Sequence, residues 1–253
     1  MEQKYYWGNA VTEFNIIRAT VICEGQSEDA FVKRILSPYI LSVTDNRVLL
    51  QPRIVVTLMD RRKGKKYTGG LVSFSKAWGD ISKTIREGLP VATMFDFFQL
   101  PGSFPGYSDI NVFHNDREKA EYLEKCLYQK VMRDFPSYPQ GYFIPYLQLH
   151  EFETLFFCDL TRLKDGYLSQ GEQKAIDHLI KSVNGIAPED INNGPDTAPS
   201  KRLLNTIAYH KGENASDILE KIGIEKMISM CPHFSAFVNS LKGLANFSYR
   251  ISE

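Results

Sequence analysis

Four acidic residues stand at or just beyond the ends of apolar segments of this sequence, where carboxylates can take part in chemistry. They are Glu24, Asp96, Glu151 and Glu153. A single acid in such a place is usually a helix cap or part of a solvated turn. Several converging carboxylates repel one another, so a folded chain tolerates them chiefly where a cation neutralises the site. All-oxygen ligands favour Mg²⁺ or Mn²⁺ over zinc, and such an ion suits phosphoryl chemistry because it polarises the phosphate and activates a bound water.

The segments that precede these acids are predicted to be strands of one sheet. Short runs of apolar and β-branched residues indicate strands over residues 19–23, 52–58, 90–98 and 142–149. Amphipathic spacing indicates helices over residues 71–87 and 116–135. The alternation of strands and helices predicts an α/β fold with a mostly parallel sheet, flanked by helices and joined by right-handed crossovers. Parallel strands end at the same edge, and open sheets bind ligands there.

Beyond about residue 165 the pattern becomes helical. Helices are expected over residues 171–183, 200–210, 215–221 and 224–244. We therefore predict an α/β core over residues 1–160 and a helical C-terminal extension over residues 161–253 that packs on this core. Within the core, Ser27 and Asp116 are expected to cap helices, and Pro145 suggests an edge position or a bulge in the fourth strand.

The charge balance limits how the protein could bind nucleic acid. Lys plus Arg and Asp plus Glu both number 30 in the 253 residues, whereas nucleic-acid-binding proteins usually carry a basic excess. Any contact with DNA or RNA must then come from a local patch or a partner. The basic run at residues 61–66 is compatible with a solvated loop or with a phosphate-contacting loop.

Compartment and membrane association follow from other simple patterns. No apolar run approaches the roughly 18 residues of a membrane span, and residues 1–15 lack the apolar region of a signal peptide. We expect a soluble cytoplasmic protein with no membrane contact. The four cysteines are far apart without a CxxC pair, which argues against a cysteine zinc site, and Cys23 and Cys158 are expected in the core.

Four further residues are candidates for roles in substrate binding or catalysis. Lys201 and Arg202 begin a predicted helix, where cations oppose the helix dipole, so a phosphate or carboxylate partner and a plain surface role are both open. His150 is compatible with a general base or with a satisfied histidine at a strand end. Glu28 is a weaker candidate, because an acid in a first helical turn also interacts favourably with the dipole.

Several motifs resemble a known family. The stretch VICEGQSEDAFVKRIL resembles the opening of a TOPRIM domain, the fold of topoisomerases, DnaG-type primases, OLD-family nucleases and the RNase that matures 5S ribosomal RNA. Together, EGQSEDAF, TMFDFFQLPGSFPG, LHEFETLFF and APSKRL resemble a bacterial TOPRIM-like family of unassigned function, of the DUF4276 type, over roughly residues 19–244.

This resemblance implies roles for individual residues. Glu24 matches the TOPRIM glutamate, which is a metal ligand or general acid/base, and Asp96 matches the first aspartate of the family's DxD motif. Position 98 is Phe, so the DxD motif is incomplete. Glu151 or Glu153 is then the candidate for the missing carboxylate, with Glu153 slightly favoured.

Three functions follow as expectations. The first is a Mg²⁺- or Mn²⁺-dependent nuclease or related phosphoryl-transfer enzyme, which the resemblance links with an ATPase partner and phage defence. The second is a non-catalytic TOPRIM-like subunit or sensor, for which Phe98 is the best support. The third is a phosphatase or nucleotide hydrolase that uses the same carboxylates. The sequence also leaves a homo-oligomer open.

Overall fold

A parallel sheet forms the centre of the computed structural model, which describes residues 16–60, 65–68, 73–191, 194, 197–208 and 213–247. The strand order is β2-β1-β5-β6, and β7 also pairs with β5. All these pairings are parallel. The strands are β1 (Ile17–Cys23), β2 (Val48–Ile54), β5 (Val91–Asp96), β6 (Phe143–Ile144) and β7 (Leu147–Gln148). A separate antiparallel pair joins β3 (Val56–Asp60) to β4 (Lys65–Thr68).

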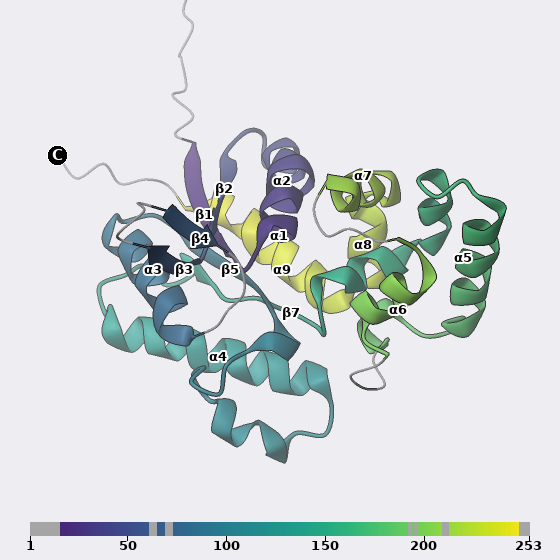
Figure 1. Cartoon of the computed structure of the whole chain (residues 1–253). Coiled ribbons are helices and arrows are strands. Elements are labelled where there is room, and N and C mark those ends of the chain that lie inside the picture. Colours follow the sequence, from purple (N-terminus) through teal and green to yellow (C-terminus); the bar gives the residue numbers. More distant parts are fainter. Residues whose placement is uncertain are drawn as a thin grey trace, which may run out of the picture.

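Helices cover both faces of the sheet, as Figure 1 shows. One face packs against α1 (Gln26–Phe31), a π-helical turn (Val32–Leu36), α2 (Ser37–Val43) and α9 (Pro232–Gly243). The other face packs against α3 (Phe74–Arg86) and α4 (Asp116–Asp134). Alternating side chains of the strands supply both cores, because successive residues point to opposite faces: Val21 joins the first core and Ile22 the second. The predicted α/β fold with a mostly parallel, helix-flanked sheet is confirmed.

The C-terminal part of the chain is helical and shares a core with the sheet. It contains α5 (Gln170–Ser182), α6 (Pro199–Thr206), α7 (Glu213–Ile222), α8 (Ile224–Met230) and α9. The ring of Phe31 on α1 lies 5.6 Å from Phe152 and 6.0 Å from Phe234, centroid to centroid. These contacts place α9 against the sheet-covering helices, while the division between residues 160 and 161 stays a prediction.

Prolines interrupt two elements that were expected to be continuous. The helix predicted over residues 224–244 is two helices, because Pro232 lacks a backbone N–H and begins α9 instead of continuing α8. The strand predicted over residues 142–149 is divided at Pro145 into β6 and β7. A side chain bridges this gap: the backbone N–H of Tyr146 donates to Thr93 Oγ1 at 2.9 Å.

Two predicted helix caps and one predicted strand were misplaced by a few residues. The N-cap of α1 is Gly25 instead of Ser27, and that of α4 is Asn115 instead of Asp116. The Asn115 side chain accepts from the Glu118 N–H at 2.9 Å, which is the bond a cap must make. The strand predicted over residues 52–58 is shared between β2 and β3, which meet near Val55.

Other sequence expectations can be compared with the described residues. Cys23 and Cys158 are buried in the core, as predicted, and neither is in a disulfide. None of the helices in the described part of the chain is long and apolar enough to cross a membrane. Of the basic run, residues 61–63 lie outside the described residues, and Lys65 and Lys66 belong to β4.

Candidate functional site

Glu24 and Asp96 lie together at the carboxyl ends of two neighbouring strands. Cys23, the last residue of β1, pairs with Met94 of β5, so Glu24 emerges beside the end of β5. The backbone N–H of Asp96 donates to Glu24 Oε2 at 3.2 Å. Both side chains are buried, each with 5 % of its surface exposed. The parallel pairing of β1 and β5 therefore brings together two acids that are 72 residues apart in sequence.

Glu28 is a third buried carboxylate at this edge. It lies in the first turn of α1, and its Oε2 accepts from the Gly25 N–H at 2.9 Å, which turns the side chain back toward the end of β1. Burial raises the pKa of Glu28 to about 7; the charges of Glu24 and Glu153 raise it too, while backbone hydrogen bonds oppose the rise. The structure thus assigns Glu28, Glu24 and Glu153 to one electrostatic cluster.

Glu151 and Glu153 make different contacts. Both belong to the segment after β7, where Glu151 precedes the 3₁₀ helix Phe152–Cys158. Glu153 is 1 % exposed and affects Glu28 electrostatically. Glu151 Oε2 instead accepts from the Ser200 N–H at 2.9 Å, at the start of α6. Residues two positions apart at the start of a helix point in different directions, so only Glu153 joins the Glu24 cluster.

The two cations expected at a helix start lie in the first turns of α6, which begins at Pro199. Lys201 is exposed, whereas Arg202 is partly buried and donates from Nε to the Thr197 carbonyl at 2.7 Å. Glu151 bonds to the backbone at the amino end of this helix and supplies the negative charge that the helix dipole favours there.

His150 contacts residues outside the Glu24 cluster. Its backbone has a φ of 64°, unusual for a residue with a side chain. Its Nε2 lies 2.7 Å from the Glu189 carbonyl oxygen, and its Nδ1 lies 3.8 Å from Asp116 Oδ2. The ring also lies 5.2 Å from that of Phe98, centroid to centroid and tilted by 38°, and Phe98 is 40 % exposed. Burial lowers the pKa of His150, although the nearby acids and the bond to Glu189 oppose this.

Buried ion pairs behind the site were missed by the sequence analysis. Glu189 Oε2 accepts from Arg117 at 2.7 Å and from the His233 N–H at 3.1 Å, so it ties α4 to the amino end of α9. His233 Nε2 in turn lies 2.9 Å from Glu124 on α4. In the sequence, Glu189 stands in an Asn/Pro/Gly-rich segment that resembles an ordinary surface loop. No local motif predicts that it contacts Arg117 and His233, which are far away in the sequence.

The carboxylates fit a hard divalent cation by their chemistry. Glu24, Asp96 and Glu153 offer only oxygen and are buried. Burial, together with the charges of Glu24 and Glu153, raises the pKa of the neighbouring Glu28. Within the described ranges, no three His, Cys, Asp or Glu side chains are arranged to hold a metal ion as they stand. Binding would therefore require the side chains to turn toward a common centre.

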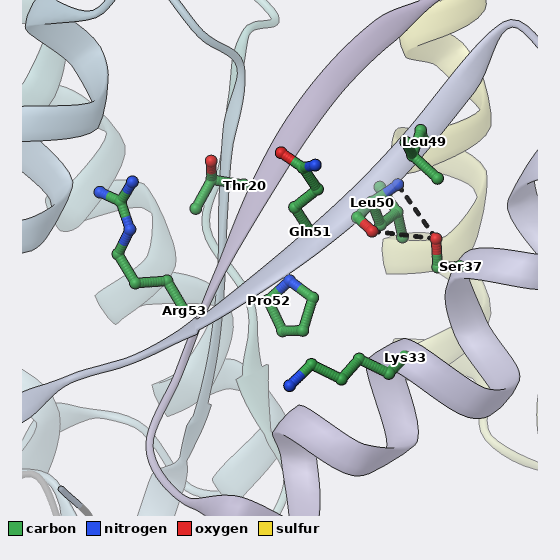
Figure 2. A pocket seen from close by; sticks show the side chains of 8 residues that line it. All are labelled: Thr20, Lys33, Ser37, Leu49, Leu50, Gln51, Pro52 and Arg53. Atoms are coloured by element: carbon green, nitrogen blue, oxygen red, sulfur yellow. Dashed lines mark hydrogen bonds between the residues drawn. The ribbon is translucent and has the colours of Figure 1, made fainter.

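A cavity along β2 is a weaker candidate site. It has a volume of about 600 Å³, and Figure 2 shows Lys33 and Arg53 among the residues that line it. Lys33 donates to Asp29 at 2.6 Å, and Arg53 lies 3.6 Å from the Glu87 carboxylate. Because both cations already have partners in the chain, this cavity lacks the free positive charge that an anionic substrate would need.

Comparison with known families agrees with the resemblance seen in the sequence. The model of a family described as "Domain of unknown function (DUF4276)" matches residues 23–242. The structure is similar to that of the C-terminal region of the OLD protein from Xanthomonas campestris pv. campestris, with 12 % identity and a TM-score of 0.41, covering 91 % of this chain and 97 % of that chain. No curated protein matches.

Proposed function

This chain belongs to the DUF4276 family, a domain of unknown function, and we propose from its own residues that it is a Mg²⁺- or Mn²⁺-dependent phosphoryl-transfer enzyme that cleaves DNA or RNA. The observation that carries the proposal is the buried pair Glu24 and Asp96 at the ends of β1 and β5, beside Glu28, whose pKa the charges of Glu24 and Glu153 help to raise. Buried carboxylates that repel one another are costly to a folded protein, and a divalent cation offsets that cost.

Glu24, Asp96 and Glu153 are the residues that would hold the ion. When bound, Mg²⁺ or Mn²⁺ supplies charge stabilisation to a phosphate and a more acidic water. Glu28 has a pKa of about 7, so it exchanges a proton near neutral pH and is suited to general acid/base work at this edge. Glu153 takes the place of the second aspartate that Phe98 replaces in the DxD motif.

Substrate binding is assigned to the start of α6. Glu151 anchors this helix through Ser200, so Lys201 projects from an element fixed to the same segment as Glu153. An exposed lysine there supplies a positive charge for a phosphate group. The neutral charge balance of the chain fits a protein that shares nucleic-acid binding with a partner. An ATPase partner, a role in phage defence and a cytoplasmic location, all implied by the resemblance or by sequence pattern, belong to this proposal.

One observation favours a second candidate function. Phe98 occupies the place of the second aspartate, and no three ligands in the described part of the chain are already arranged for a metal. A TOPRIM-like subunit that binds partners without catalysis would have both properties.

Cleavage assays with purified protein separate these two functions. Labelled DNA and RNA are incubated with Mg²⁺ or Mn²⁺, with and without the product of any neighbouring ATPase gene. Glu153→Gln should reduce cleavage by about a hundredfold or more, on the scale of losing a catalytic group. Glu151→Gln should have little effect, because the glutamine oxygen still accepts from Ser200. Activity retained by both variants would exclude Glu153 as a ligand, and no cleavage by wild type under any condition would favour the non-catalytic subunit.

A further inference from the structure

A second cavity lies at the amino end of α4, with a volume of about 500 Å³. It brings together imidazole, carboxylate and guanidinium groups from three parts of the chain. Its lining residues are His114, Asn115, Asp116, Arg117, His150, Glu189 and Asp190. Arg117 is paired with Glu189, and Lys119, which does not line the cavity, is paired with Asp116 at 3.0 Å. The Asp190 carboxylate therefore leaves the lining with excess negative charge at neutral pH. The cavity therefore favours a cation.

His150 is oriented in this cavity as metal-binding histidines are. A ligating histidine almost always donates its other ring N–H to a carbonyl or carboxylate, which fixes the tautomer and the direction of the free nitrogen. Here Nε2 lies 2.7 Å from the Glu189 carbonyl oxygen, so Nε2 carries the proton and Nδ1 keeps its lone pair. Nδ1 is buried and has no hydrogen-bond partner among the described residues. The side chain is 4 % exposed, which gives the ring little freedom to turn away.

We propose that His150 Nδ1 and the Asp116 carboxylate hold a divalent transition-metal ion of the zinc type, at a site separate from the Glu24 cluster. Nδ1 and Asp116 Oδ2 are 3.8 Å apart. Two zinc ligands at about 2.0–2.1 Å and a tetrahedral angle lie about 3.3 Å apart, so the Asp116 side chain needs to approach by only about 0.5 Å. Asp116 is 29 % exposed, and its other oxygen, Oδ1, accepts from Lys119 at 3.0 Å, which leaves Oδ2 to face His150.

The donor types distinguish this site from the one proposed for catalysis. An imidazole nitrogen with one carboxylate suits zinc and its neighbours, whereas an all-carboxylate cluster suits Mg²⁺ or Mn²⁺. Because no three ligands are arranged together in the described ranges, the ion has two protein ligands here and completes its coordination with water. Asp190 and His114 line the same cavity and contribute negative charge and a second imidazole at its walls.

Zinc binding to the full chain tests the proposal directly. Purified metal-free protein competes with a chromophoric chelator for Zn²⁺, and the same variants are examined with Co²⁺ by visible absorption. Asp116→Asn removes the carboxylate at a partly exposed position and should not impair folding. His150→Asn removes the imidazole with a residue that tolerates a positive φ. His178→Asn, on the exposed face of α5, is the matched control. Glu24→Gln tests independence from the carboxylate cluster.

The expected result is a zinc site in wild type, His178→Asn and Glu24→Gln, in addition to any zinc that the carboxylate cluster takes up. Its affinity should fall at least about tenfold in Asp116→Asn and in His150→Asn, because each loses one of only two protein ligands. Zinc binding that is absent from wild type, or equal in wild type and Asp116→Asn, would overturn the proposal. Loss of the site in Glu24→Gln as well would place the zinc in the carboxylate cluster and also contradict it. None of these outcomes depends on whether the protein cleaves nucleic acid.

Discussion

Replacing Glu28 with Gln should change how the stability of this protein depends on pH. In the folded chain the pKa of Glu28 is raised from its ordinary value of 4.5 to about 7, chiefly by burial and also by Glu24 and Glu153. Between these two values the folded state binds a proton that the unfolded state has released. The free energy of unfolding therefore falls as the pH rises from 4.5 to about 7 and stays lower above it.

The size of this effect follows from the same shift. A rise in pKa from 4.5 to about 7 corresponds to about 3 kcal/mol in the free energy of unfolding. This stability is present when Glu28 is protonated and is lost once Glu28 is fully ionised. Glu28→Gln is uncharged at every pH, and its amide oxygen still accepts from the Gly25 N–H. The variant should match wild type near pH 4.5 and be more stable by up to about 3 kcal/mol at pH 8.

Urea unfolding in the presence of a chelator, at several values of pH, measures this difference. Other groups titrate over the same range, so the quantity to compare is the stability of the variant minus that of wild type. Glu225→Gln provides the control, because Glu225 is exposed on α8 and should leave the pH profile unchanged. A difference between Glu28→Gln and wild type that stays constant from pH 4.5 to 8 would refute the idea that the buried cluster holds a proton.

Two further predictions concern residues around the site. Glu189→Gln weakens the pair with Arg117 and the contacts at the start of α9, so urea unfolding should show a loss of about 2 kcal/mol; an unchanged midpoint would contradict this. Lys201→Ala should leave stability within about 0.5 kcal/mol and make the salt dependence of nucleic-acid binding shallower by about one unit of slope. Arg202→Ala loses the bond to Thr197 and should reduce stability more than Lys201→Ala does. If both variants show the same salt slope as wild type, neither side chain contacts a phosphate group.

Periodicity predicted the sheet and its carboxyl edge because these depend on local patterns. The runs that became β1 and β5 are apolar and β-branched, and an acid ends or follows each one. Alternation with helices then predicts parallel strands, which places Glu24 and Asp96 at the same edge of the sheet. The strand order, in which β1 and β5 are neighbours, brings the two acids together. The predicted ends of strands and helices were wrong where a single residue changed the backbone, as at Pro145 and Pro232.

The contacts that tie the helices together were not predictable in the same way. Glu189 holds the start of α9 across 44 residues of sequence, and its own loop carries no periodic signal. The direction of the His150 ring depends on a carbonyl 39 residues away and on a backbone φ of 64°. Neither feature is reflected in the types of the neighbouring residues, so both are visible only in the folded structure.

Calorimetry with Mn²⁺ tests the central claim, that the acids at the ends of β1 and β5 form a divalent-metal site. Wild-type protein and the double variant Glu24→Gln/Asp96→Asn are titrated under identical conditions. The account predicts a saturable binding heat in wild type that disappears in the double variant. In the absence of metal the double variant should be at least as stable as wild type, because like charges have been removed from a buried cluster. Equal heats from the two proteins would contradict the claim.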